Sequence, residues 1–114
     1  MKSEPGNVQV EDNVASQRWE ARVDGYVAVA QCKRLGNAIA FTHTEVPSEL
    51  SGRGIAGILV RTALEDVRER GLKVVPFCPF VASYIRRHSE YEALVPPQYK
   101  MLVQKRKEGL QSEL

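Results

Sequence analysis

The most informative stretch of the sequence reads Ser51-Gly52-Arg53-Gly54-Ile55-Ala56-Gly57 and lies between a strand-like segment and a helix-like segment. Glycines let a backbone approach a ligand closely, and the start of a helix offers free N–H groups to an anion. The stretch therefore predicts a pyrophosphate, or a similar anion, above the start of the helix. The alternative is a glycine-rich connection that binds nothing.

The segment after this loop has the pattern of a helix from Gly54 to Arg70. Apolar residues recur along it at helical spacing, and Gly71 is a residue suited to ending it. Lys73 to Pro76 then reads as a short strand that is apolar at its centre. Because strand, helix and strand follow one another at this length, we expect the two strands to be parallel.

The front of the chain reads as an antiparallel meander. Asp24-Gly25 and Gly36-Asn37 are two-residue turn signals, and Pro47 ends the last strand. The expected strands cover Trp19 to Val23, Tyr26 to Gln31 and Ala38 to Val46. The expected fold is therefore of the α/β (α+β) class: a mixed sheet with an antiparallel N-terminal meander and a parallel strand-helix-strand core.

The last third of the chain is expected to be helical. Pro79 suits the first position of a short helix over Phe80 to His88, and Gln98 to Lys107 has the pattern of a final amphipathic helix after the break at Pro96-Pro97. A chain of 114 residues has room for a single domain, 1–114. We expect residues 1–7 and 108–114 to form flexible termini.

Composition excludes several classes of protein. The net charge of +2 is too weak to indicate nucleic-acid binding, and the runs Arg86-Arg87 and Lys105-Arg106-Lys107 are expected to be solvated, since no aromatics interleave with them. No apolar run approaches a membrane span, and the start of the chain is unlike a secretion signal. Cys32 and Cys78 lack paired spacing, which favours a reducing, cytoplasmic compartment.

The sequence around the glycine loop argues against two known nucleotide-binding motifs. Gly52, Gly54 and Gly57 satisfy the pattern G-x-G-x-x-G of dinucleotide-binding folds. That fold has its first glycine almost directly after a strand and an acidic residue at the end of the next strand, whereas here a loop intervenes and no acid follows. A phosphate-binding loop with Gly-Lys-Ser/Thr is also absent from the sequence.

The same loop resembles the signature of the GNAT acetyltransferases, Gln/Arg-x-x-Gly-x-Gly/Ala, with Gly54 and Ala56 in the last two places. Ser51 stands where that family usually has Gln or Arg. A longer resemblance, from Trp19 to Val95, is to small single-domain N-acetyltransferase-like proteins, which share a His-Thr-Glu-Val-Pro run, a Gly-x-Gly-Ile-Ala turn and a Cys-Pro-Phe-Val run. This range, 19–95, is the expected GNAT-like core.

The resemblance implies acetyl-CoA as cofactor and an unidentified amine as acceptor. Backbone groups of Thr44, Glu45 and Val46 would pair with the pantetheine arm, and Ser51 to Gly57 would hold the pyrophosphate. Ser83 and Tyr84 would contact the other side of the cofactor. The resulting hypothesis is an acetyl-CoA-dependent N-acetyltransferase. The alternatives are a CoA-binding module with weak or lost activity, favoured by Ser51, and an interaction domain that uses its basic tail.

Two residues are candidates for the chemistry of acetyl transfer. His43 lies just upstream of the loop and is a candidate base for the acceptor amine. Cys78, with Pro79 behind it, is expected at a helix N-cap, where the helix field favours the thiolate. It would either return a proton to CoA or accept the acetyl group itself. The competing interpretations are a strand histidine without a catalytic partner and a buried structural cysteine.

Two further readings concern the remaining polar residues. Tyr84 is an alternative proton donor, and His88 is expected to interact with the end of its helix rather than with a substrate. Cys32, His43, Cys78 and His88 do not have the close spacing of metal ligands, so we expect no metal site.

Overall fold

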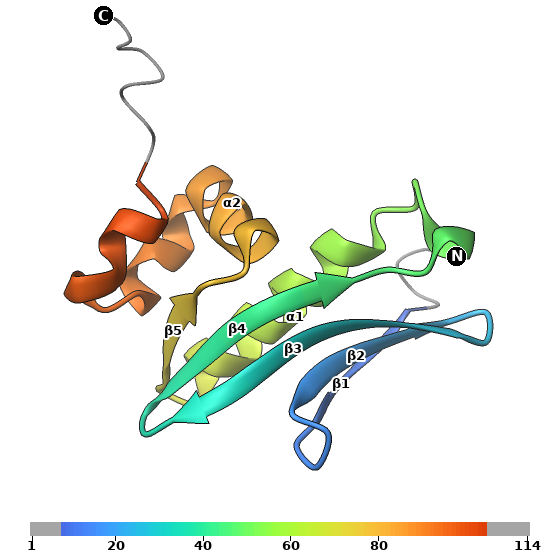
Figure 1. Ribbon diagram of the computed structural model, residues 1–114, viewed down its shortest axis with the longest axis horizontal. Coiled ribbons are helices and arrows are strands. Elements are labelled where there is room, and N and C mark those ends of the chain that lie inside the picture. Colours follow the sequence, from blue (N-terminus) through green and yellow to red (C-terminus); the bar gives the residue numbers. More distant parts are fainter. Residues whose placement is uncertain (1–7, 105–114) are drawn as a thin grey trace, which may run out of the picture.

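The computed structural model describes residues 8–104 of the chain. A five-stranded sheet has the order β1-β2-β3-β4-β5, in which neighbours in sequence are also neighbours in the sheet (Figure 1). The strands are β1 (Gln9–Asn13), β2 (Arg18–Val23), β3 (Tyr26–Leu35), β4 (Ala38–Glu45) and β5 (Lys73–Pro76). The first four pair antiparallel, and β4 pairs with β5 in parallel. The fold class and the parallel pair predicted from sequence are confirmed.

The turns of the meander have the backbone that their sequences predict. Asp24 and Gly25 both have positive φ, 52° and 84°, as the hairpin turns that match the twist of antiparallel strands require. Gly36 also has a positive φ of 60°. Strand β3 runs on to Leu35, beyond the Gln31 end predicted from sequence. Strand β1 was not predicted, because its sequence QVEDN has only one apolar residue.

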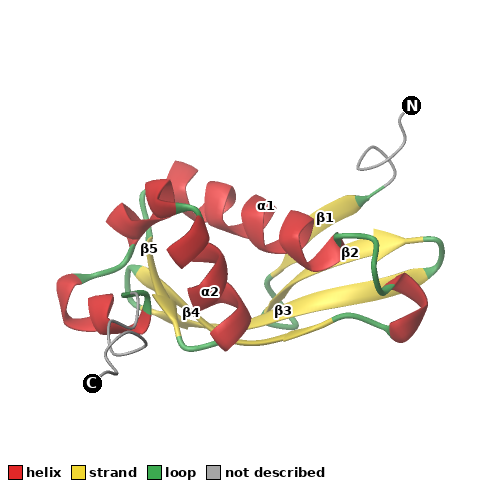
Figure 2. Ribbon diagram, turned by 90° about the horizontal axis from the view of Figure 1, so that it is seen from above, coloured by secondary structure: helices red, strands yellow, loops and turns green. Residues whose placement is uncertain are grey.

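The helices cover the two faces of the sheet unequally. They are η1 (Ser48–Leu50), α1 (Ile55–Glu69), α2 (Pro79–Arg87), η2 (Ser89–Leu94) and η3 (Pro97–Leu102). Helix α1 lies along one face, which we call the α1 face, where its apolar stripe is buried against Trp19, Ile39 and Phe41 (Figure 2). On the opposite face, Tyr99 and Leu102 of η3 pack on a smaller cluster at β4 and β5.

The end of the chain departs from the sequence prediction. An α-helix was expected over Gln98 to Lys107, but residues Pro97–Leu102 form a 3-10 helix. Pro96 precedes this helix and Pro97 is its first residue. The last three residues of the expected helix, 105–107, lie outside the described residues together with the basic run predicted there. The short helix after β5 is confirmed as α2, with Pro at its first turn.

The ends of α1 are fixed by glycines. Gly54 is the N-cap in the left-handed conformation, with φ 72° and ψ 17°. After the helix, Gly71 has φ 72°, and the N–H of Leu72 donates to the carbonyl of Val67 at 3.1 Å, which completes a helix-terminating turn. Gly57 lies within the helix, so its backbone is ordinary.

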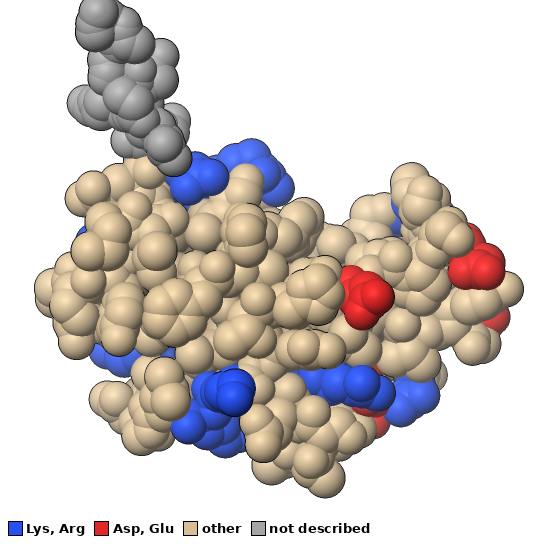
Figure 3. Space-filling view, viewed as in Figure 1, with Lys and Arg blue, Asp and Glu red and all other residues tan. Residues whose placement is uncertain are grey.

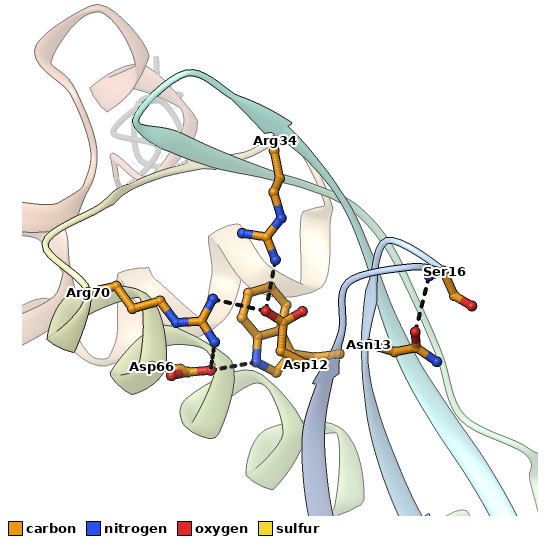
Figure 4. A network of polar contacts seen from close by, with 7 residues as sticks. Asp12, Asn13, Ser16, Arg34, Asp66 and Arg70 are labelled. Carbon is orange, nitrogen blue, oxygen red and sulfur yellow. Dashed lines mark hydrogen bonds and ion pairs between the residues drawn. The ribbon is translucent and has the colours of Figure 1, made fainter.

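A polar network joins β1 to the rest of the fold (Figure 4). Asp12 Oδ2 accepts hydrogen bonds from Arg34 Nη2 at 2.8 Å and from Arg70 Nη1 at 2.9 Å, which brings three elements together. Arg70 also binds Asp66, whose carboxylate accepts the indole N–H of Trp19 at 3.2 Å. The two guanidinium groups lie over the Trp19 ring, each 5.8 Å from its centroid. Asp12 therefore ties the edge strand to both β3 and α1.

We predict that Asp12→Ala lowers the free energy of unfolding by about 1–3 kcal/mol, because both arginines lose a charged partner that is itself buried. The matched control is Glu11→Ala on the same strand. Glu11 is 63% exposed and reaches Arg22 only at 3.9 Å, so its loss should cost less than about 0.5 kcal/mol. Urea unfolding of both variants measures the difference, and equal effects would contradict the role given to Asp12.

A second pair of variants tests the backbone of the glycine loop. A Cβ added at Gly54 meets nothing within 4 Å, so Gly54→Ala adds only left-handed strain, and we expect a loss of roughly 1–2 kcal/mol. At Gly57 the added Cβ makes an ordinary 3.9 Å contact with Tyr84, and Gly57→Ala should stabilise the helix by about 0.5–1 kcal/mol. Opposite signs in thermal or urea unfolding are the expected result; the same sign for both would contradict it.

Candidate functional site

The parallel strands β4 and β5 separate after Phe41, at a point that we call the fork. Their pairing runs from Ala38 opposite Lys73 to Phe41 opposite Pro76, and the N–H of Cys78 then donates to the carbonyl of Phe41 at 2.8 Å. Strand β4 continues to Glu45 beyond this point. Within residues 8–104, its only strand neighbour there is β3. One edge of the β4 backbone, next to the start of α2, is therefore left without a strand partner.

An irregularity in β4 decides which way its side chains point. Gln31 of β3 is opposite His43, while the next residue, Cys32, is opposite Phe41, so Thr42 is an extra residue on β4. Such a bulge shifts the alternation of side chains by one position. Thr44, opposite the core residue Ala30, consequently points to the α1 face. His43 and Glu45 point to the opposite face, which we call the open face.

On the α1 face the bulge brings Thr44 to Cys78. The Thr44 hydroxyl lies 3.2 Å from the Cys78 thiol, and either atom can be the donor. Cys78 is the N-cap of α2 and Pro79 is the first helical residue, as predicted from sequence. The thiol is 3% exposed, inside the main core cluster. The Cys78 thiol, a group that can act as a nucleophile or as a proton donor, thus lies at the fork with the Thr44 hydroxyl as its polar neighbour.

His43 has a different environment. Its side chain is 57% exposed, and its Nε2 lies 3.8 Å from Glu45 Oε1, whose side chain is 69% exposed. The structure therefore brings His43 to Glu45 and does not bring it to Cys78. His43 belongs to β4 and Cys78 to the start of α2, and the two side chains lie on opposite faces of the sheet.

The glycine loop lines a cavity of about 390 Å³ at the start of α1. Gly52 and Gly54 have left-handed backbones, with φ 79° and 72°, so side chains at these positions are disfavoured and the backbone stays accessible. In Figure 3 the outline is hollowed between the part built by α2 and the part built by this loop. The cavity is lined by Val46, Leu50, Ser51, Gly52, Gly54, Ile55, Ala56, Gly57, Phe80 and Arg87.

Arg53 is the residue of the glycine loop whose side chain is directed away from the cavity. Its Nη1 donates to Asp24 Oδ2 at 3.0 Å, which ties the loop to the turn between β2 and β3. It is not among the residues that line the cavity. Its charge is therefore directed to the hairpin and not to the space above α1.

The two residues predicted on α2, Ser83 and Tyr84, are not among those that line the cavity. Ser83 Oγ accepts a hydrogen bond from Arg87 Nη1 at 2.7 Å. Tyr84 is buried, which raises the pKa of its phenol, and its ring stacks on His88 with centroids 4.1 Å apart. His88 Nδ1 lies 2.9 Å from the Tyr84 carbonyl, a local contact at the helix end.

Sequence reasoning missed Arg87 as a site residue because it was read as part of a solvated basic pair. The signal was its spacing from Phe80, since residues seven apart share one face of a helix. Both line the cavity. Phe80, Ser83 and Arg87 thus form a stripe on α2 that faces the glycine loop.

A second cavity, of about 530 Å³, lies on the open face. Its apolar lining comes from Val27, Val29, Val46 and Pro47, and Glu45 contributes a carboxylate. Arg18 also lines it, but its Nε donates to Glu20 at 2.7 Å, and this contact lowers the pKa of the buried Glu20 carboxyl. Because Arg18 is already paired with Glu20, Glu45, whose neighbour is His43 at 3.8 Å, is the charge best placed to meet a cationic ligand here.

Two absences concern the described part of the chain. Residues 8–104 contain no group of three His, Cys, Asp or Glu side chains arranged to hold a metal ion. No helix within the same range is both long enough and apolar enough to span a membrane.

Comparison with known proteins identifies the family. The family model described as GCN5-related N-acetyl-transferase matches residues 18–94. Protein NATD1 of Mus musculus is 33% identical over 86 residues, covering 73% of this chain and 78% of the relative. Protein NATD1 of Homo sapiens is 32% identical over 84 residues, covering 71% and 74%.

A solved structure shares the fold. The solution structure of a GCN5-like protein from Staphylococcus aureus superimposes with a TM-score of 0.61 at 22% identity, over 79% of this chain and 89% of that one. Together with the family model, which spans strands β2 to β5, the glycine loop and α2, this confirms the resemblance found in the sequence. The chain belongs to the GCN5-related N-acetyltransferase family.

Proposed function

We propose that this protein is an acetyl-CoA-dependent N-acetyltransferase that transfers an acetyl group to a small or peptide-borne amine. Members of the family generally use acetyl-CoA as cosubstrate. The observation that carries the proposal is the alignment, along one side of β4, of the glycine loop, the unpaired β4 edge and the Cys78 thiol. These are the parts needed to hold a pyrophosphate, an amide-containing arm and a thioester in that order.

The residues present fit such a cofactor. At one end, the glycine backbone and the first N–H groups of α1 form a cradle for the pyrophosphate. Along β4, backbone groups of Thr44, Glu45 and Val46 pair with the pantetheine amides as an added strand would. At the other end, the thioester lies near Cys78 and Thr44. Ser83 and Tyr84 of α2 close the far side.

Two roles remain for Cys78 in this proposal. In the first, the acceptor nitrogen forms the new C–N bond, the C–S bond breaks, and the Cys78 thiol gives its proton to the departing thiolate. In the second, the Cys78 thiolate takes the acetyl group with release of CoA, and the amine then attacks the acetyl-cysteine. The Thr44 hydroxyl, 3.2 Å from Sγ, can donate a hydrogen bond to the thiolate in either case.

His43 can act as base only for an acceptor that approaches from the open face. The cavity there, with its three valines and Glu45, gives such an acceptor a place to bind. Glu45, 3.8 Å from His43, places a carboxylate beside this base and favours a cationic amine as acceptor. The acceptor nitrogen would then reach the thioester at the fork between β4 and β5.

A second candidate function is a CoA-binding module with little catalytic activity. The observations that favour it are the deep burial of Cys78 and the position of His43 on the other face of the sheet. Ser51 also stands in place of the Gln or Arg usual in the signature. Measurement of acetyl-CoA turnover beside binding separates the two functions.

We predict that acetyl-CoA and CoA raise the melting temperature, whereas NAD and ATP do not. A ligand that binds only the native state stabilises it by about 2.7 kcal/mol at a hundred times its Kd. Differential scanning fluorimetry over a ligand panel measures this. Stabilisation by NAD without any by CoA would contradict the proposed cofactor.

We predict that Cys78→Ala and His43→Ala each lower acetyl-CoA hydrolysis or transfer by about a hundredfold, the low end of acid–base contributions, and leave CoA affinity nearly unchanged. Neither side chain is proposed to hold the cofactor, so its loss should affect rate and not binding. Full activity in both variants would contradict these assignments, and Tyr84 would be tested next.

Mass spectrometry after mixing with acetyl-CoA separates the two roles of Cys78. An acetyl adduct on the wild type that is absent from Cys78→Ser supports acetyl capture, whereas substantial residual activity of Cys78→Ser supports proton donation. Cys32→Ser is the matched control, because Cys32 is equally buried and burial raises the pKa of its thiol, which disfavours the thiolate. An adduct that persists in Cys78→Ser but disappears from Cys32→Ser would contradict both roles.

A further inference from the structure

The glycine loop proposed to hold the cofactor supplies too little positive charge for a pyrophosphate. A pyrophosphate carries two negative charges that glycine N–H groups and a helix terminus compensate only in part. Ser51, at the position that is usually Gln or Arg in the family signature, brings no charge. Arg53 is the loop's own cation, but its guanidinium is held by Asp24 at 3.0 Å and lies away from the cavity.

One basic side chain reaches the cavity from the opposite wall. Arg87 belongs to the last turn of α2 and lines the same cavity as Gly52, Gly54 and Gly57. Of the ten residues around this cavity it is the only one with a charge. Figure 3 shows Lys and Arg side chains exposed on the α2 side of the hollow.

The Arg87 side chain is also held in one orientation, and among the described residues its charge is not paired with a carboxylate. Its Nη1 donates to Ser83 Oγ at 2.7 Å, one helical turn earlier, which steers the guanidinium along the stripe facing the loop. Within residues 8–104 no carboxylate forms an ion pair with it, in contrast to Arg68 and Arg70, which pair with Glu65 and Asp66. A guanidinium keeps several N–H donors after one hydrogen bond and matches phosphate oxygens in a bidentate geometry.

We propose that Arg87 binds the pyrophosphate of CoA from α2, across the cavity from the glycine loop, and supplies the side-chain charge that Ser51 lacks. The assignment rests on the proposed function, since it needs CoA in this cavity. In it, Ser83 is a positioning residue that holds Arg87 toward the loop. The cofactor is then clamped between backbone N–H groups of one element and a guanidinium of another.

The test compares Arg87→Gln with Arg86→Gln, which removes the same charge from the neighbouring position of the same helix. Isothermal titration with CoA should show affinity about tenfold weaker or more for Arg87→Gln, the loss of one charge-assisted contact, and at most a twofold change for Arg86→Gln. Arg87→Lys should recover part of the loss. Melting temperatures without ligand should be similar for all variants, because Arg87 is exposed and buries no partner.

Dephospho-CoA, which lacks the 3′-phosphate, locates the contact. If Arg87 binds the pyrophosphate, Arg87→Gln weakens dephospho-CoA by the same factor as CoA. If the effect disappears with dephospho-CoA, the residue contacts the 3′-phosphate and the assignment is overturned. Equal CoA affinity for wild type and Arg87→Gln also overturns it and leaves the proposed function standing, whereas no CoA binding by the wild type overturns both.

Discussion

The extra residue in β4 is the constraint on which the arrangement of the site depends. If Thr42 were paired like the other residues of β4, the regular alternation of a strand would send His43 to the α1 face with Phe41, and Thr44 to the open face. The single insertion reverses this beyond Phe41. It pairs Thr44 with Cys78 and leaves His43 beside Glu45. Strand β4 therefore contributes Glu45 to the cavity on the open face, and Val46, the residue after the strand, lines both cavities.

Much of the fold could be predicted because its signals are local. The turn at Asp24-Gly25, the apolar spacing of α1 and the Pro after Cys78 each act within a few residues, and each element was found where these signals place it. Strand β1 was missed since it is held by partners distant in sequence. Arg34 and Arg70 both bind Asp12 Oδ2 there, and no pattern within QVEDN reports them.

The candidate site was less predictable for the same reason. The glycine loop is a local motif, and the cavity at the start of α1 contains most of its residues. The faces of His43 and Thr44 depend on the register between β3 and β4, which an alternating pattern cannot give once a residue is inserted. Arg53 was expected to hold the pyrophosphate and Arg87 to be solvated. Asp24, 29 residues earlier, holds Arg53 away from the cavity, whereas Arg87 lines it. The roles assigned to His43 and Cys78 stay predictions.

The two outer strands have a consequence for the behaviour of the protein at high concentration. A sheet that ends in a long, flat, apolar strand can be extended by a strand from another molecule, which is how many aggregates begin. Here β5 is only four residues long and ends in Pro76, which has no N–H to donate, and η3 packs on the cluster around it. At the other edge, β1 carries Glu11 and Asp12. Neither β1 nor β5 offers a long apolar template for growth, so the sheet can stay open at both edges without closing into a barrel.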